Sequence, residues 1–150
     1  YKREETMNQS FHYLLMAAQG LFQRAVMGEL SEAGLTTGQP KVLDYLGLHD
    51  GSIQKQIAAG CQIDPATLTG LLGRMEEKGL IERRSQDGDR RSLYVYLTAE
   101  GWEKQKLVRA AMGRMEEQVL DSLDQSQRDA LKAGLLQVCL SLTEDKEALQ

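Results

Sequence analysis

Proline and aromatic residues are scarce in this sequence. It contains two prolines in 150 residues, and aromatic residues make up 5%. Together with abundant Leu, Ala, Gln and Glu, this scarcity predicts a mostly helical fold and disfavours a mainly β one. The chain is long enough for one compact domain with a genuine core and too short for two ordinary domains. We therefore expect a single domain over residues 1–150.

Cysteines and long apolar runs are equally rare. The two cysteines, Cys61 and Cys139, cannot make a disulfide framework, so reduced thiols of a cytosolic protein are the plain interpretation. No apolar run approaches the roughly 18 residues of a membrane span, and the sequence does not begin with the charged-then-apolar pattern of a secretion signal. We expect a cytoplasmic protein with no membrane partner.

Net charge is −4, with an isoelectric point near 5.3, which at first argues against a nucleic-acid partner. The acidity, however, is concentrated near the end of the chain. From Glu116 onward there are eight acidic and three basic residues, so the preceding 115 residues are close to neutral. The stretch from Arg83 to Arg91 holds four arginines against two aspartates. A local basic region therefore remains available for phosphate.

Hydrophobic spacing and helix-capping residues predict six helices and one β-hairpin. Asp64-Pro65 is a clear helix start, because Asp caps well and Pro loses nothing at the first helical position. Residues 86–89, Gln-Asp-Gly-Asp, are typical of a hairpin turn. The expected order is a helix over 7–31, a helix after Thr36-Thr37, a short helix over 53–59 capped by Ser52, a helix from Asp64 to Lys78-Gly79, strands over 80–84 and 92–97, a helix from Thr98 to about 123, and a last helix from Ser126.

The central unit, residues 53–98, has the parts that reading of DNA requires. A short helix, a tight turn and a second helix are followed directly by a hairpin with arginines at its tip. Small and polar residues on the second helix suit a major groove, and hairpin arginines suit an adjacent minor groove. We expect Asp89 to hold an arginine side chain in place. The predicted DNA-binding residues are Pro65, Ala66, Thr67, Thr69, Gly70, Arg74, Arg84, Asp89, Arg90 and Arg91.

An ordered set of short motifs resembles the MarR family of bacterial transcription regulators. The motifs are Leu35-Thr36-x-x-Gln39, Ile63-Asp64-x-x-Thr67-Leu68-Thr69-x-x-Leu72-x-x-Met75-Glu76-x-Lys78-Gly79-Leu80-Ile81-x-Arg83, Asp89-Arg90-Arg91 and Leu97-Thr98-x-x-Gly101. The resemblance implies a mainly α fold with a small β-hairpin wing, a winged helix-turn-helix. It implies a recognition helix over 64–78, a DNA-binding part over about 36–98, and dimerisation helices over about 7–32 and 99–145. It also implies that Asp89 and Arg91 organise minor-groove contact at the wing tip.

A homodimer is also expected on physical grounds. The last helix carries an apolar stripe. Together, this stripe and the apolar first helix have more apolar surface than a small winged-helix core can cover. A two-fold dimer presents two recognition helices to successive major grooves, which predicts an inverted-repeat operator with half-sites roughly 10 bp apart or a multiple of that. The function predicted is that of a repressor under the control of a small molecule or an oxidant. The apolar stripe of the last helix consists of Leu131, Leu135, Val138 and Leu142.

Control of such a regulator has two candidate locations. The resemblance places His12, Met16 and Tyr45 around a cleft that takes a small aromatic or amphipathic effector; the alternative is that His12 and Tyr45 are ordinary half-buried residues. Cys61 and Cys139 are candidate redox sensors, although small buried hydrophobes are the favoured interpretation for each. The histidines and cysteines lack metal-ligand spacing, so we expect no zinc and no cofactor.

Two other functions compete with DNA binding. The acidic C-terminal stretch supports a winged helix that serves only as a protein-interaction module. An enzyme is a poor match, because the sequence has no glycine-rich phosphate loop, no nucleophile–base pair and no metal-spaced ligands.

Overall fold

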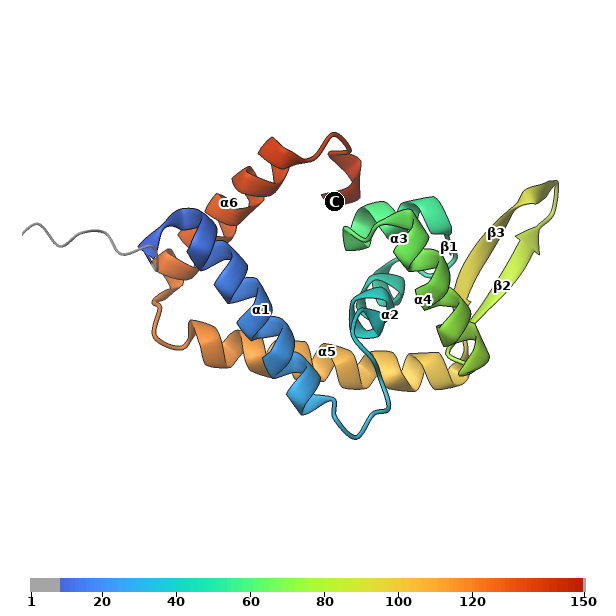
Figure 1. Cartoon of the computed structure of the whole chain (residues 1–150), viewed down its shortest axis with the longest axis horizontal. Helices are drawn as coiled ribbons and strands as arrows, with labels where there is room; N and C mark the ends of the chain where they lie inside the picture. The colour runs from blue at the N-terminus through green and yellow to red at the C-terminus, as the bar shows by residue number, and fades with distance from the viewer. Residues whose placement is uncertain (1–8, 150) are drawn as a thin grey trace, which may run out of the picture.

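The computed structural model describes residues 9–149, except for the side chain of Arg90. It is mainly helical with one small sheet, as predicted (Figure 1). Residues 7 and 8 of the predicted first helix lie outside the described part. The elements in chain order are α1 (Phe11–Glu29), α2 (Gln39–Leu48), β1 (Ser52–Ile53), α3 (Gln54–Cys61), α4 (Pro65–Glu77), β2 (Ile81–Gln86), β3 (Asp89–Leu97), α5 (Ala99–Leu120), α6 (Gln125–Leu142) and η2 (Glu147–Leu149).

The long helix α5 joins the two parts of the molecule. It contacts both α1 and α2, so the outer helix α1 and the compact unit of α2, α3, α4 and the hairpin lie along the same helix (Figure 1). From the far end of α5, α6 turns back, and η2 comes into contact with α3. The helices thus form a ring, and the β2–β3 hairpin projects outward from the compact unit (Figure 1).

Helices α4 and α5 start where their capping residues predict. The Asp64 carboxylate accepts the Thr67 backbone N–H at 3.1 Å, and Pro65 is the first residue of α4. The Thr98 hydroxyl accepts the Gly101 N–H at 3.0 Å and starts α5. The last helix begins at Gln125, one residue earlier than the predicted start at Ser126, and Asp124 provides its cap.

Two local expectations are wrong. Ser52 does not cap a helix: Ser52 and Ile53 form strand β1, which pairs antiparallel with β3 opposite Val95 and Tyr94. The sheet is therefore three-stranded, in the order β1-β3-β2. Gly51 directs the chain into this pairing with a φ of +80°, and its N–H donates to the Val95 carbonyl.

The start of α2 also differs from the prediction. The helix begins at Gln39 after Gly38, whose φ is +91°, and neither Thr36 nor Thr37 caps it. Instead, the Gln39 side-chain oxygen accepts the backbone N–H of Thr36 at 3.0 Å. This side chain therefore fastens the loop that precedes its own helix.

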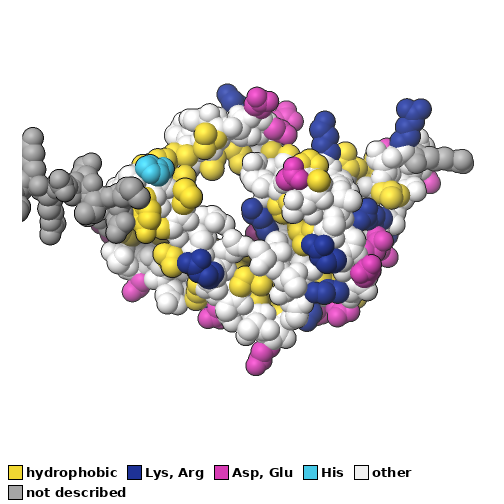
Figure 2. Space-filling model, viewed as in Figure 1, with side chains coloured by type: hydrophobic (Ala, Val, Ile, Leu, Met, Phe, Trp, Pro, Cys, Tyr) yellow, Lys and Arg dark blue, Asp and Glu magenta, His cyan; other side chains and the backbone are white. Residues whose placement is uncertain are grey.

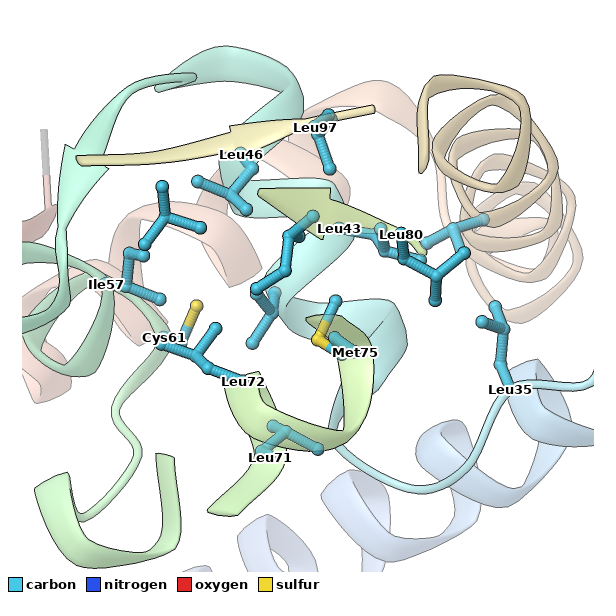
Figure 3. Packing of buried hydrophobic residues seen from close by; sticks show 14 of the residues in the cluster. Leu35, Leu43, Leu46, Ile57, Cys61, Leu71, Leu72, Met75, Leu80 and Leu97 are labelled. Carbon is cyan, nitrogen blue, oxygen red and sulfur yellow. The ribbon is translucent and has the colours of Figure 1, made fainter. Parts of the chain in front are cut away.

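One hydrophobic core holds the compact unit together (Figure 3). The stripe predicted for α4 is buried, and it meets apolar residues of α2, α3 and the strands. Residues of this core with almost no exposed surface include Leu43, Leu46, Ile57, Leu68, Leu72, Met75 and Ile81. Because this stripe is buried, the opposite face of α4 is turned to solvent.

The outer helices leave much apolar surface uncovered. No residue of α6 is buried, and large side chains of α1 and α6 are exposed around a central opening whose rim is partly hydrophobic (Figure 2). None of the helices within residues 9–149 is both long and apolar enough to cross a membrane. The exposed large residues of these two helices are Phe11, Tyr13, Leu14, Met16, Leu21, Leu131, Leu135, Leu136 and Leu142.

Two glycines of α5 test how tightly it packs against the start of β2. A Cβ at Gly101 would lie 2.0 Å from the Leu80 carbonyl oxygen, whereas a Cβ at Gly113 meets nothing within 4 Å. We expect Gly101→Ala to lower the free energy of unfolding by about 1–3 kcal/mol. Gly113→Ala should raise it by up to about 1 kcal/mol, because alanine has the higher helix propensity. Urea denaturation at equal protein concentration measures both, and equal effects of the two substitutions would contradict the packing.

Candidate nucleic-acid interface

Helices α3 and α4 form a braced helix-turn-helix. The turn is short because Gln62 ends α3 in the left-handed region, with a φ of +53°. The Gln54 amide donates to the Thr69 hydroxyl at 2.6 Å. This hydrogen bond joins the start of α3 to the N-terminal half of α4. The angle between the two helices is therefore held by a polar contact as well as by the core.

The outward face of α4 carries the residues predicted to read DNA. All six of them are exposed, opposite the buried stripe: Pro65, Ala66, Thr67, Thr69, Gly70 and Arg74. A Cβ at Gly70 would lie 3.3 Å from a guanidinium nitrogen of Arg74, so the glycine leaves room for this arginine to lie along the helix. Most of the face is small, which suits close approach to another surface.

The two threonine hydroxyls on this face already have partners. The Thr69 hydroxyl donates to the Pro65 carbonyl at 3.0 Å and accepts from Gln54, and the Thr67 hydroxyl lies 3.4 Å from the Asp64 carboxylate. On the outward face, the two threonines present their methyl groups and the remaining lone pairs of their hydroxyl oxygens. Apolar contact or hydrogen-bond acceptance is thus more available to them than donation.

Asp89 organises the backbone of the wing. Its carboxylate accepts the N–H groups of Arg91 at 2.9 Å and Ser92 at 3.1 Å, and it also accepts the Tyr94 hydroxyl at 3.2 Å. These contacts, the Arg91 N–H first, hold the pKa of Asp89 below its ordinary value of 3.8. The expectation that Asp89 holds an arginine side chain needs correction for Arg91, since Asp89 binds its backbone rather than its guanidinium.

The wing arginines differ in what they contact. Arg84 lies over the Tyr96 ring, 4.5 Å from its centroid, and pairs with Glu82. Arg91 is exposed and has no ion-pair partner within the described residues. Arg90 was predicted at the same tip, but its side chain lies outside the described part. Arg91 is accordingly the described wing residue with a free cationic group, while Arg84 is committed to its neighbours.

Sequence reasoning missed one part of this surface. A groove of about 300 Å³ lies between the start of α3 and the wing, and Gln54, Lys55 and Arg91 are among its lining residues. The pairing of β1 with β3 brings these distant segments together. A two-residue strand has no hydrophobic pattern of its own, so the sequence held no signal for this proximity.

The cavity next to the outer helices is not the predicted one. It measures about 270 Å³ and lies between α1, the start of α2, the helix-turn-helix turn and α5. His12, Met16 and Tyr45 do not line it: the first two are exposed on α1, and Tyr45 packs on His49 and beside Gly60. The lining residues are Gln19, Phe22, Gln23, Val26, Met27, Gly38, Pro40, Lys41, Ile63 and Met112.

The two cysteines lie in different environments. Cys61 is buried in the core, and burial raises the pKa of its thiol to about 11. This agrees with the favoured interpretation of a small buried hydrophobe. Cys139 is exposed on α6, contrary to that interpretation. Within residues 9–149 no group of three or more His, Cys, Asp or Glu side chains is placed to hold a metal ion.

A braced helix pair followed directly by a β-hairpin defines a winged helix-turn-helix protein. Residues 33–92 match the model of the MarR family. Transcriptional regulator HosA of Escherichia coli O111:H- is 31% identical over 105 residues, which cover 70% of this chain and 73% of HosA. The chain belongs to the MarR family of transcriptional regulators, and not to a family of enzymes.

Two further relatives agree with this assignment. The HTH-type transcriptional regulator BilQ of Clostridium symbiosum (strain WAL-14163) is 25% identical over 125 residues, which cover 83% of this chain and 87% of BilQ. The structure of MepR from S. aureus, solved as a complex with DNA, has a TM-score of 0.81 at 26% identity; the match covers 89% of this chain and 97% of MepR. BilQ is a transcriptional regulator and MepR binds DNA in its complex, so the interaction-module alternative is not favoured.

The environment of Cys61 makes its reactivity measurable. A rise in the thiol pKa from 9.0 to about 11 reduces its thiolate fraction about a hundredfold at pH 8, and burial adds a steric barrier. In a Cys139→Ser variant, we expect alkylation by iodoacetamide to be at least about a hundredfold slower in the native protein than in urea. Comparable rates in the two states, followed by mass spectrometry, would contradict the buried placement.

Proposed function

We propose that this protein is a sequence-specific regulator that binds double-stranded DNA as a homodimer and represses transcription from an inverted-repeat operator. The observation that carries the proposal is the outward face of α4: its small residues are exposed in one continuous strip, beside a wing with a free arginine. The DNA complex of MepR supports it, because that relative has the same fold at 26% identity.

The geometry suggests how the surface meets DNA. The α4 face from Pro65 to Arg74 is narrow enough for a major groove, where Arg74 suits a guanine edge or a phosphate. Arg91 and Arg90 at the wing suit a neighbouring minor groove, which has enhanced negative potential in A·T tracts. Lys55, at the start of α3, is added here as a phosphate contact because it shares a groove with Arg91.

The uncovered apolar surface of α1 and α6 supports the proposed homodimer. Water-exposed apolar area on this scale is unfavourable, and a second copy contributes the same two helices to cover it. In this assembly residues 9–32 and 99–145 form the dimerisation region, and residues 36–98 form the DNA-binding part. Two recognition helices related by a two-fold axis require two half-sites in opposite orientation.

A small effector is proposed for the 270 Å³ cavity in place of the site around His12, Met16 and Tyr45. Its wall is mainly apolar, with Gln19, Gln23 and Lys41 as its polar members. This lining suits an aromatic or amphipathic molecule whose polar group faces those three side chains. Control by oxidation is assigned to Cys139 in preference to Cys61, because Cys61 is buried and its thiol pKa is raised.

Selection of duplexes from a random-sequence DNA pool tests the whole proposal. With the purified protein at moderate salt, we expect recovery of a two-fold symmetric motif with half-sites roughly 10 bp apart or a multiple of that. Light scattering at micromolar concentration should give the mass of a dimer. A monomer bound to DNA without sequence preference would contradict the proposal.

Substitution of Arg91 tests the assignment of the wing. Arg91→Ala should weaken binding to the selected duplex about tenfold and lower the slope of log K against log salt by about one, since one phosphate-neutralising cation is removed. Lys146→Ala removes an exposed cation outside both the DNA-binding part and the dimerisation region, and it is the matched control. Unchanged affinity and slope in both Arg91→Ala and Thr67→Ala would overturn the contact assignment.

A further inference from the structure

Lys78, the residue that caps the C-terminal end of α4, reaches a distant part of the chain. Its ammonium group donates to the Gly34 carbonyl at 3.0 Å and lies 3.4 Å from the Gln39 side-chain oxygen. Both acceptors are about forty residues earlier: Gly34 lies in the loop between α1 and α2, and Gln39 is the first residue of α2. A lysine on the recognition helix is thus bound to the segment that connects the winged helix with the outer helices.

Gln39 is an unusual partner for this contact. Its side chain is completely buried, and its oxygen accepts both the Thr36 N–H at 3.0 Å and the Lys78 ammonium. Its amide nitrogen has no hydrogen-bond partner among the described residues. A buried donor without a partner lowers the stability of the fold. The side-chain hydrogen bonds of Gln39 are made by its oxygen alone. That oxygen joins the loop and α4 at one point.

The same loop touches α4 at a second place. A Cβ at Gly38 would lie 3.1 Å from a methyl carbon of Leu71, so the backbone of the loop lies directly against the buried face of α4. Gly38 also lines the 270 Å³ cavity together with residues of α1. The contacts of Leu71 and Lys78 therefore connect α4 with a segment that borders both the cavity and the outer helices.

Lys78 also lies at the opposite end of α4 from the residues proposed to contact bases. The 13 residues of α4 span about 20 Å, and the small residues that suit a groove occupy its first half. Two of the three donors of the ammonium group are directed at protein oxygens. These observations separate Lys78 from the contact residues at the other end of the helix.

We propose that Lys78 is a positioning residue for specific DNA binding: by tying the C-terminal end of α4 to Gly34 and Gln39, it sets the orientation of the recognition helix relative to the dimerisation helices. This inference rests on the proposed function. A dimer needs two recognition helices at a defined separation, so an error in their orientation penalises the symmetric operator. Non-specific DNA, which is bound through phosphate contacts, tolerates that error.

The test compares four variants, Lys78→Met, Lys78→Arg, Gln39→Met and the double Met variant, on the selected duplex and on a scrambled one. Lys78→Met should weaken binding to the selected duplex about tenfold, with scrambled binding within about twofold of wild type and an unchanged salt slope. Lys78→Arg should restore binding to within about threefold. Gln39→Met, which keeps every charge, should weaken specific binding about threefold, and the double variant should bind no worse than Lys78→Met.

Several outcomes overturn the inference. A salt slope that falls by about one, with equal losses on both duplexes, makes Lys78 a phosphate contact. Wild-type affinity in Lys78→Met and Gln39→Met removes the positioning role. All titrations are run where circular dichroism shows the variants folded, and Lys146→Met controls for loss of one cation. If wild-type protein itself shows no preference between the duplexes, the proposed function fails first, and that result is distinct from the others.

Discussion

The structure depends on burial of one stripe of α4. Leu68, Leu71, Leu72 and Met75 are covered by α2, α3 and the strands, and burial of each such side chain contributes about 1.5–3 kcal/mol. Because this side of the helix is buried, the opposite side faces solvent, and it carries Pro65, Ala66, Thr67, Thr69, Gly70 and Arg74. The surface proposed for DNA is thus a consequence of the core, and any change that rotates α4 would exchange the two faces.

Polar contacts add orientation to this burial. Gln54 joins α3 to Thr69 near the start of α4, and Lys78 joins its end to Gly34 and Gln39. Hydrophobic packing alone is non-directional and tolerates small rotations, whereas hydrogen bonds of defined length do not. The helix is therefore held at both ends, by different elements. One end is fastened within the helix-turn-helix and the other to the loop that comes from α1.

The wing shows how the same residue type acquires different roles. Arg84 and Arg91 lie on neighbouring strands of one hairpin, but Arg84 is held by Glu82 and the Tyr96 ring while Arg91 is free. Asp89, which looks unfavourable beside phosphate, is occupied by backbone N–H groups that shape the turn. Because its charge is stabilised locally, it remains ionised at neutral pH and acts on the wing backbone rather than on the ligand.

The sequence alone determined the helices with strong caps, the buried stripe of α4 and the hairpin, because these depend on residues close together along the chain. The order of these elements was enough to indicate a winged helix-turn-helix. Only the tertiary structure decided the pairing of β1 with β3, the residues that line the cavity and the contact of Lys78 with Gln39. Each of these joins segments far apart in sequence, and local spacing carries no information about which distant groups meet.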